Sequence, residues 1–179
     1  TIQHTPSFSD KFGTVKCSTR QHKLVGTEGY DTSLFCRLAQ KYNLTEPVAE
    51  HLAANYGDRA PLICELFSQY PRLRDPVGLS KAEGHSYTYE DFKYPFTLGE
   101  LYYCLDYEHV CHPADFLARR CRLAFLDAQR ALSAFDEVVD VMARKYGWSS
   151  EKKHQMKLET VNYIKQMGIV PNDTPYGTL

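Results

Sequence analysis

The sequence has little net charge and no long hydrophobic run. Its 21 lysines and arginines are offset by 22 aspartates and glutamates, which gives a formal net charge of -1. Nucleic acids and anionic lipid surfaces attract clustered positive charge, so this balance argues against a nucleic-acid partner. No segment approaches the roughly 20 consecutive apolar residues that a membrane-spanning helix requires. We therefore expect a globular chain that binds no nucleic acid and contains no membrane-spanning helix.

Several signatures of cofactor and catalytic sites are also missing. The sequence contains neither G-x-G-x-x-G nor G-x-x-x-x-G-K, the patterns that cradle dinucleotides and nucleotide phosphates. No CxxC pair occurs among the six cysteines, which are Cys17, Cys36, Cys64, Cys104, Cys111 and Cys121. We expect free thiols that act as small buried hydrophobes, rather than a disulfide framework. The sequence thus predicts no catalytic residue and no cofactor-binding residue in this chain.

Apolar residues, 43% of the chain, recur at helical spacing and indicate an all-α fold. A capping Asp31 or Thr32 precedes the first helix, Thr45 the second and Ser149 or Ser150 the last. Thr97 and Glu100 have the spacing of a capping box, in which each side chain bonds the backbone of the other. The predicted helices cover residues 31–43, 45–57, 58–70, 97–111, 113–147 and 149–168. We therefore expect a compact bundle of about five to six helices.

The remaining segments show no sustained period. Residues 71–96 contain three prolines and several tyrosines and are expected to form one long ordered loop. Residues 1–30 are rich in small polar residues and are interpreted as a linker that arrives at a domain. The helical domain is then expected to span 31–168, and 169–179 to form a C-terminal tail.

The run from Cys104 to His112 contains residue types that also bind metals. Cys104, Glu108 and Cys111 would share one side of a helix, and Glu108 would face His112. A structural zinc site needs four convergent ligands at recognised spacings, and this run has neither CxxC nor HExxH. We favour two buried cysteines and a helix end with histidines, and therefore predict no metal site.

An arginine-rich stretch follows Pro113. At about 100° per residue, Asp115, Arg119 and Arg122 fall together opposite the apolar stripe, and Arg120 flanks the core edge. Two interpretations stay open: a solvent-exposed pair of Asp115 with Arg119, or an arginine face that contacts another surface through carboxylates. We expect Arg120 to be the most important of the three for folding, because its loss would leave a partly buried carboxylate partner unpaired. On the preceding helix, Glu100 and Glu108 are the expected carboxylate partners of these arginines. The candidate interface residues are Glu100, Glu108, Asp115, Arg119, Arg120 and Arg122.

Three stretches of the sequence resemble a known family. They are His51 to Ala60 (HLAANYGDRA), Leu98 to Leu132 (LGELYYCLDYEHVCHPADFLARRCRLAFLDAQRAL) and Met142 to Ser149 (MARKYGWS). In this order they resemble the C-terminal domain of FAD-dependent glycerol-3-phosphate dehydrogenases and the related α-glycerophosphate oxidases. The resemblance covers about residues 15–168.

The resemblance implies a helical domain that packs on a flavin domain or on a second subunit in a homodimer. It also implies that FAD, the substrate site and the catalytic residues belong to an N-terminal part outside this chain, which alone would be inactive. Eukaryotic relatives are mitochondrial, associate with the inner membrane and pass electrons from glycerol 3-phosphate to ubiquinone, so any membrane contact would come through the parent enzyme. The alternative is a free-standing helical interaction module that shares the fold.

Overall fold

Helices form almost all of the regular structure in residues 18–79 and 93–166, the residues that the computed structural model describes. The only pairing of extended backbone within these ranges is an isolated bridge between Pro76 and Thr97. No helix in them is long and apolar enough to cross a membrane. The prediction of an all-α fold is confirmed.

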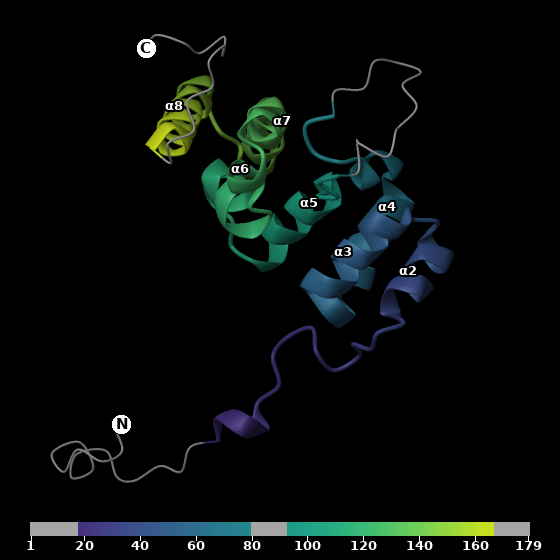
Figure 1. Cartoon of the computed structure of the whole chain (residues 1–179). Coiled ribbons are helices and arrows are strands. Elements are labelled where there is room, and N and C mark those ends of the chain that lie inside the picture. Colours follow the sequence, from purple (N-terminus) through teal and green to yellow (C-terminus); the bar gives the residue numbers. More distant parts are fainter. Residues whose placement is uncertain (1–17, 80–92, 167–179) are drawn as a thin grey trace, which may run out of the picture.

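Seven α-helices lie in the described ranges. They are α2 (Leu34–Tyr42), α3 (Glu46–Tyr56), α4 (Ala60–Gln69), α5 (Leu98–Tyr107), α6 (Leu123–Leu126), α7 (Ala128–Tyr146) and α8 (Ser150–Gln166). Three short 3-10 helices are η2 (Thr19–Gln21), η3 (Gly57–Arg59) and η4 (Pro71–Arg74), and η6 (Asp115–Arg120) is a π-helix. Figure 1 shows α2, α3 and α4 at one end, α6, α7 and α8 at the other, and α5 between them.

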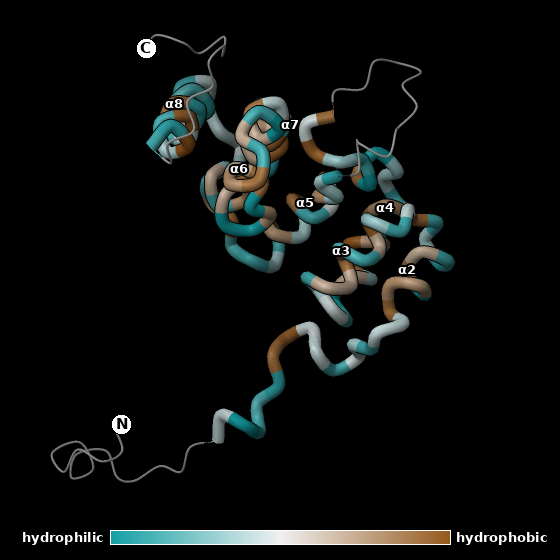
Figure 2. Tube along the Cα trace, viewed as in Figure 1, coloured by the Kyte–Doolittle hydropathy of each residue, from teal (hydrophilic) through white to brown (hydrophobic). Residues whose placement is uncertain are grey.

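Two hydrophobic clusters form the core. One lies among α2, α3 and α4, and the other among α5, α6, α7 and α8. Helix α5 contributes to both, because Tyr103 packs in the first cluster while Leu101 and Cys104 pack in the second. Most of the surface of α8 is hydrophilic, which fits its position at the edge (Figure 2). Helix α5 therefore joins the two halves of the fold.

A glycine allows α4 and α5 to approach closely. A Cβ atom added at Gly99 would lie 2.4 Å from Cε1 of Phe67, a side chain that is fully buried. Real Cβ atoms do not come that close to another carbon, so a larger residue would force the two helices apart.

Most helices begin and end at the start and stop residues that the sequence contains. Thr45 precedes α3, Pro47 lies in its first turn and Gly57 ends it, as predicted. The capping box at the start of α5 is also confirmed, with the Thr97 hydroxyl accepting the N–H of Glu100 and the Glu100 carboxylate accepting the N–H of Thr97. At α2 the cap position is Ser33, while Asp31 binds the guanidinium of Arg37 instead.

The predicted single helix over 113–147 is wrong. The segment begins as a π-helix, in which Cys121 donates its N–H to the carbonyl of Phe116 five residues earlier. Arg122 then adopts a left-handed backbone with φ 57°, and Asp127 is extended. Asp127 accepts the N–H of Arg130 and so begins α7 as a new helix. This break explains why the chain has more helices than predicted.

The long segment between α4 and α5 is partly described. It begins with η4. Val77 donates its N–H to the carbonyl of Phe96 at 2.9 Å, and this bond holds the two ends of the segment next to each other. The middle of the expected loop, 80–92, lies outside the described residues, as do 1–17 of the expected linker and the expected tail 169–179.

The five cysteines in the described ranges are free thiols, as predicted. Cys64, Cys104 and Cys121 are buried, whereas Cys36 and Cys111 are exposed, so the expectation of buried cysteines holds for three of them. Cys17 lies outside the described residues.

Candidate functional site

A polar pocket of about 450 Å³ lies where α3, α5 and the η6–α6 segment meet. Its lining consists of His51, Asn55, Tyr56, Phe96, Glu100, Glu108, Arg119, Arg120, Cys121, Arg122 and Leu126. Five of the six candidate interface residues are among them, and the sixth, Asp115, pairs with Arg119. The structure thus brings the predicted residues together around one cavity.

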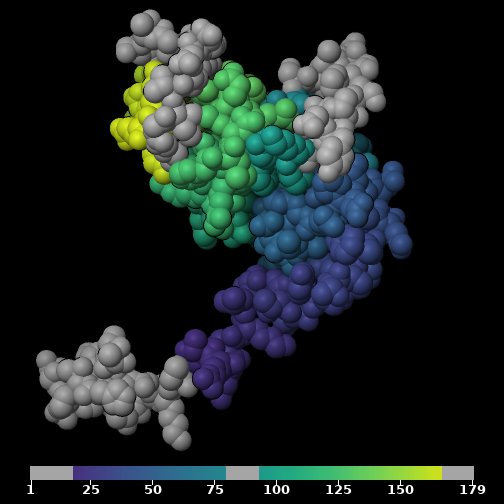
Figure 3. Space-filling view, in the orientation of Figure 1, coloured from purple at the N-terminus to yellow at the C-terminus, as the bar shows by residue number. Residues whose placement is uncertain are grey.

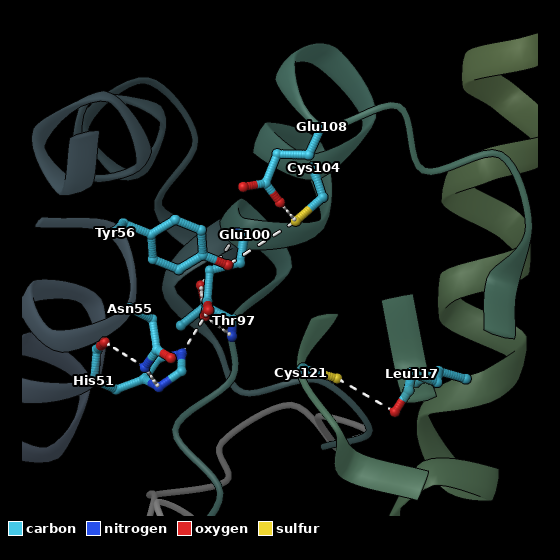
Figure 4. Close-up of polar contacts among 9 residues, drawn as sticks. All are labelled: His51, Asn55, Tyr56, Thr97, Glu100, Cys104, Glu108, Leu117 and Cys121. Carbon is cyan, nitrogen blue, oxygen red and sulfur yellow. Dashed lines mark hydrogen bonds and ion pairs between the residues drawn. The ribbon is translucent and has the colours of Figure 1, made fainter. Parts of the chain in front are cut away.

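The most buried ionisable group of this pocket is Glu100, whose side chain is 1% exposed. Its Oε1 atom lies 2.5 Å from Nε2 of His51, and its Oε2 atom accepts the backbone N–H and the hydroxyl of Thr97 at 2.6 and 3.0 Å (Figure 4). A buried carboxylate is tolerated only when hydrogen bonds replace its lost hydration. The expected pairing of Glu100 with the arginines is wrong, because His51 and Thr97 occupy its two oxygens.

The ring of His51 is held from both sides. Asn55, one turn later on α3, lies with Nδ2 at 2.9 Å from Nδ1 of His51 and also donates to the His51 carbonyl (Figure 4). Because Nε2 faces a carboxylate, it carries the proton, and Nδ1 is left to accept from the Asn55 amide. No pattern in the sequence assigns a role to either residue. Their spacing of four on a helix was visible, but the partner Glu100 is 49 residues away from His51.

Glu108 forms the second polar cluster of the pocket. Its Oε2 atom accepts from Sγ of Cys104 at 3.1 Å and lies 3.2 Å from Nη1 of Arg120. Arg120 also donates to the carbonyl of Glu108, at 3.2 Å. The hydroxyl of Tyr56 is 3.9 Å from the same thiol, and burial raises the pKa of both Tyr56 and Cys104 well above the usual ranges. Both groups therefore stay protonated at neutral pH, and Cys104 is no nucleophile there.

The side chains of Arg119 and Arg120 are exposed, and each pairs with a carboxylate. Arg119 pairs with Asp115, as one of the two interpretations proposed, and its guanidinium carbon lies 5.3 Å from the centre of the Tyr163 ring. The side chains of Arg119 and Arg120 are 57% and 43% exposed. The carboxylate that pairs with Arg120 is Glu108, which is 22% exposed, so the expected partly buried partner is present. The prediction assumed 100° per residue, whereas a π-helix advances by a smaller angle. Arg122 lies beyond this helix and does not share a helical face with Asp115.

Within the Cys104–His112 run Cys104 bonds Glu108, but no third potential ligand joins this pair. Helix α5 ends at Tyr107 and His109 has a positive φ of 54°, so the expected helical face ending at Cys111 is interrupted. Within residues 18–79 and 93–166 no group of three or more histidine, cysteine, aspartate or glutamate side chains is placed to hold a metal ion. The expectation that the chain binds no zinc stays a prediction.

A second, larger pocket of about 860 Å³ lies between α4, α5 and α7. Its walls include Tyr70, Leu73, Tyr102 and Val141 together with Glu137. Burial raises the pKa of Glu137 above its ordinary value, although the N–H of Gly78, 3.4 Å from its Oε2 atom, opposes the shift. None of the predicted interface residues lines this pocket.

The fold and the site define a class of protein: a helical domain with a polar pocket, in which the carboxylates of Glu100 and Glu108 bond neighbouring side chains. Comparison with known sequences then gives the family. Residues 17–153 match the family described as the C-terminal domain of alpha-glycerophosphate oxidase, and the chain belongs to that family.

Curated relatives agree with this assignment. The chain is 42% identical over 163 residues to the mitochondrial glycerol-3-phosphate dehydrogenase of Saccharomyces cerevisiae, and 40% identical over 163 residues to that of Schizosaccharomyces pombe. Each match covers 86% of this chain and 25% of the relative. The human protein of the same name is 34% identical over 137 residues, which are 76% of this chain and 17% of that protein. The chain therefore spans about a quarter of the length of its yeast relatives.

Proposed function

We propose that this chain is the C-terminal helical domain of an FAD-dependent mitochondrial glycerol-3-phosphate dehydrogenase. The parent enzyme would oxidise glycerol 3-phosphate to dihydroxyacetone phosphate and pass the electrons to quinone at the inner mitochondrial membrane. The match to the family over residues 17–153 carries this proposal. The relatives named above, which are called mitochondrial glycerol-3-phosphate dehydrogenases, support its activity and its compartment.

Within that enzyme the domain has a structural role. The acidic, thiol and imidazole groups of the polar pocket already bond to one another, as Glu100 does to His51 and Glu108 to Cys104. A reaction centre needs groups that a substrate can reach, and the side chain of Glu100 is only 1% exposed. The flavin domain of the same polypeptide is the proposed packing partner, and FAD bound there supplies the redox chemistry. A homodimer contact through the same domain is compatible with this role.

The proposal is tested by comparing the full natural polypeptide with the isolated chain of 179 residues. We expect the full polypeptide to contain flavin and to reduce a water-soluble quinone analogue only when glycerol 3-phosphate is added. The isolated chain should be colourless and should bind neither FAD nor glycerol 3-phosphate. A full polypeptide without flavin would refute the enzyme assignment, and a yellow isolated chain would refute the structural role.

A further inference from the structure

One surface at the rim of the polar pocket places two exposed apolar side chains next to an arginine. It consists of Arg122, Phe125 and Leu126, and we refer to it as the Arg122 surface. Phe125 and Leu126 are 62% and 55% exposed. The hydroxyl of Tyr94 donates to the carbonyl of Leu126 at 3.3 Å. This hydrogen bond connects the end of α6 to the residues that precede α5. Arginine and aromatic residues are the types that are enriched where proteins contact each other.

The folding of the domain does not account for an arginine at position 122. Its backbone is left-handed, with φ 57° and ψ 14°, and glycine adopts this region at the least cost. Its carbonyl accepts the N–H groups of Phe125 and Leu126, which any residue could do. Within residues 18–79 and 93–166 its guanidinium has no hydrogen-bond or ion-pair partner.

The neighbouring arginines already have acidic partners. Arg120 lies 3.2 Å from Glu108, and Arg119 pairs with Asp115. Each pair is neutral as a whole, so among the described residues of this rim the charge of Arg122 is the one left without a carboxylate in contact. A single guanidinium fits one carboxylate through two parallel hydrogen bonds. A nucleic acid or a polyphosphate would require several unpaired cations.

The segment that precedes α2 contacts the C-terminal end of α3. The carbonyl of Gly26 accepts the N–H of Asp58 at 2.9 Å, and a Cβ atom at Gly57 would lie only 1.9 Å from that carbonyl oxygen. Tyr56, which precedes Gly57, lines the pocket. Figure 3 shows the segment before this contact, in purple, projecting from the helical body. Polypeptide that precedes Gly26 therefore arrives at the C-terminal end of α3, next to Tyr56.

We propose that the Arg122 surface is where this domain docks on the flavin domain of the same polypeptide. The occupant is a segment of that domain that presents an aspartate or glutamate next to an apolar side chain, so that the carboxylate meets Arg122 and the apolar group covers Phe125. This inference rests on the proposed function. About three quarters of the length of the yeast relatives lies outside the matched region, which leaves ample polypeptide to supply the contact.

The first experiment replaces Phe125 by the photo-cross-linking residue p-benzoylphenylalanine in the full natural polypeptide. Tyr70, 61% exposed at the end of α4 and remote from this pocket, is the matched control position. Each preparation is first assayed for reduction of the quinone analogue by glycerol 3-phosphate, so that a failed enzyme assignment is recognised separately. After irradiation, mass spectrometry identifies the peptide joined to each position.

The expected result is an intramolecular cross-link from position 125 to a peptide of the flavin domain that contains an acidic residue. Three results would overturn the proposal in an active preparation. They are a link between two copies of the polypeptide, a link that stays within residues 1–179, and a yield at position 125 no higher than at position 70.

The second experiment removes the guanidinium without straining the backbone. Arg122→Gly keeps the left-handed conformation and should lower the cross-linking yield at position 125 by about tenfold, because a charge-assisted contact is lost. Asn43→Gly makes the same kind of backbone change at φ 51°, outside the pocket lining, and should leave the yield unchanged. An unchanged yield in Arg122→Gly would refute the role of the guanidinium.

Discussion

His51 of α3 lies 2.5 Å from Glu100 at the start of α5, and the pair spans the border between the two hydrophobic clusters. The same carboxylate caps α5 through Thr97. One side chain therefore fixes both where α5 begins and how it sits against α3. Since the arginine-lined pocket is formed by these two helices and the η6–α6 segment, its shape depends on this contact.

We predict that Glu100→Gln destabilises the isolated domain by about 3 kcal/mol, because a neutral amide leaves a buried hydrogen-bond donor facing another donor. The amide oxygen can accept from His51 or from the Thr97 backbone, but the NH₂ group then meets the other of the two. Urea unfolding followed by circular dichroism measures the change.

The control for this prediction is Glu28→Gln. Glu28 is 74% exposed and lies 3.7 Å from Lys23, so its loss should change the free energy of unfolding by less than about 0.5 kcal/mol. Equal effects of the two substitutions would mean that Glu100 contributes nothing beyond an exposed carboxylate.

Arg119→Lys and Arg120→Lys should each cost the isolated domain less than about 1 kcal/mol, because both guanidinium groups are largely exposed. The sequence ranks Arg120 as the more important of the two because its carboxylate partner is partly buried, as Glu108 is at 22% exposure. A lysine at position 120 keeps the positive charge opposite Glu108, so we expect the difference between the two variants to be small. Parallel urea titrations of the two variants are the measurement. A loss of several kcal/mol in Arg120→Lys would contradict this expectation.

Local signals in the sequence predicted the fold wherever neighbouring residues decide the backbone. Thr45, Pro47 and Gly57 delimit α3 through their own conformational preferences, and the Thr97–Glu100 box begins α5. The break at Arg122 has no such signal, because arginine rarely adopts a left-handed backbone and the apolar period continues through it. A periodic pattern alone cannot distinguish one long helix from successive helices that share a core.

The site was predictable only in part. The i, i+4 spacing offers the pair of Asp115 with Arg119 as one of two interpretations, and the structure contains this pair. The expected role of Glu108 as a carboxylate partner is also confirmed, through Arg120. The contact of His51 with Glu100 depends on how α3 packs against α5, which no local pattern encodes. The sequence therefore assigns Glu100 to the wrong partner, and its role at an interface stays a prediction.

We predict that iodoacetamide at neutral pH modifies Cys36 and Cys111 and leaves Cys64 and Cys121 unmodified until the domain unfolds. The first two side chains are exposed and the second two are buried, and burial raises the pKa of each buried thiol to about 12. The thiolate is the form that reacts with iodoacetamide. A buried thiol therefore reacts slowly for two reasons: the reagent cannot reach it, and it keeps its proton at neutral pH. Mass spectrometry after alkylation with and without urea provides the measurement. Rapid modification of Cys121 in the native protein would contradict the packing described above.

The same pKa shifts predict a stability loss at high pH. In the unfolded chain a thiol ionises near its ordinary value of 9.0, while Cys121 in the folded domain keeps its proton up to about 12. The folded state therefore binds more protons between these values, and the free energy of unfolding falls as pH rises through this window. Cys121→Ser cannot ionise there and should show a shallower decline, measured by urea unfolding at several pH values. Identical slopes would mean that Cys121 does not contribute.

Gly99→Ala should destabilise the domain by about 2 kcal/mol, although alanine is the better helix former. Helix propensity favours alanine by about 1 kcal/mol, but the new methyl group would lie 2.4 Å from the ring of Phe67, which is fully buried and cannot swing aside. Overpacking of this kind outweighs the propensity. The decisive comparison is the same substitution in a Phe67→Leu background, where the ring is gone and Gly99→Ala should become neutral or stabilising. A double-mutant cycle by urea unfolding isolates the interaction of the two sites. If Gly99→Ala costs the same in both backgrounds, the close approach of α4 and α5 at this point is not what requires the glycine.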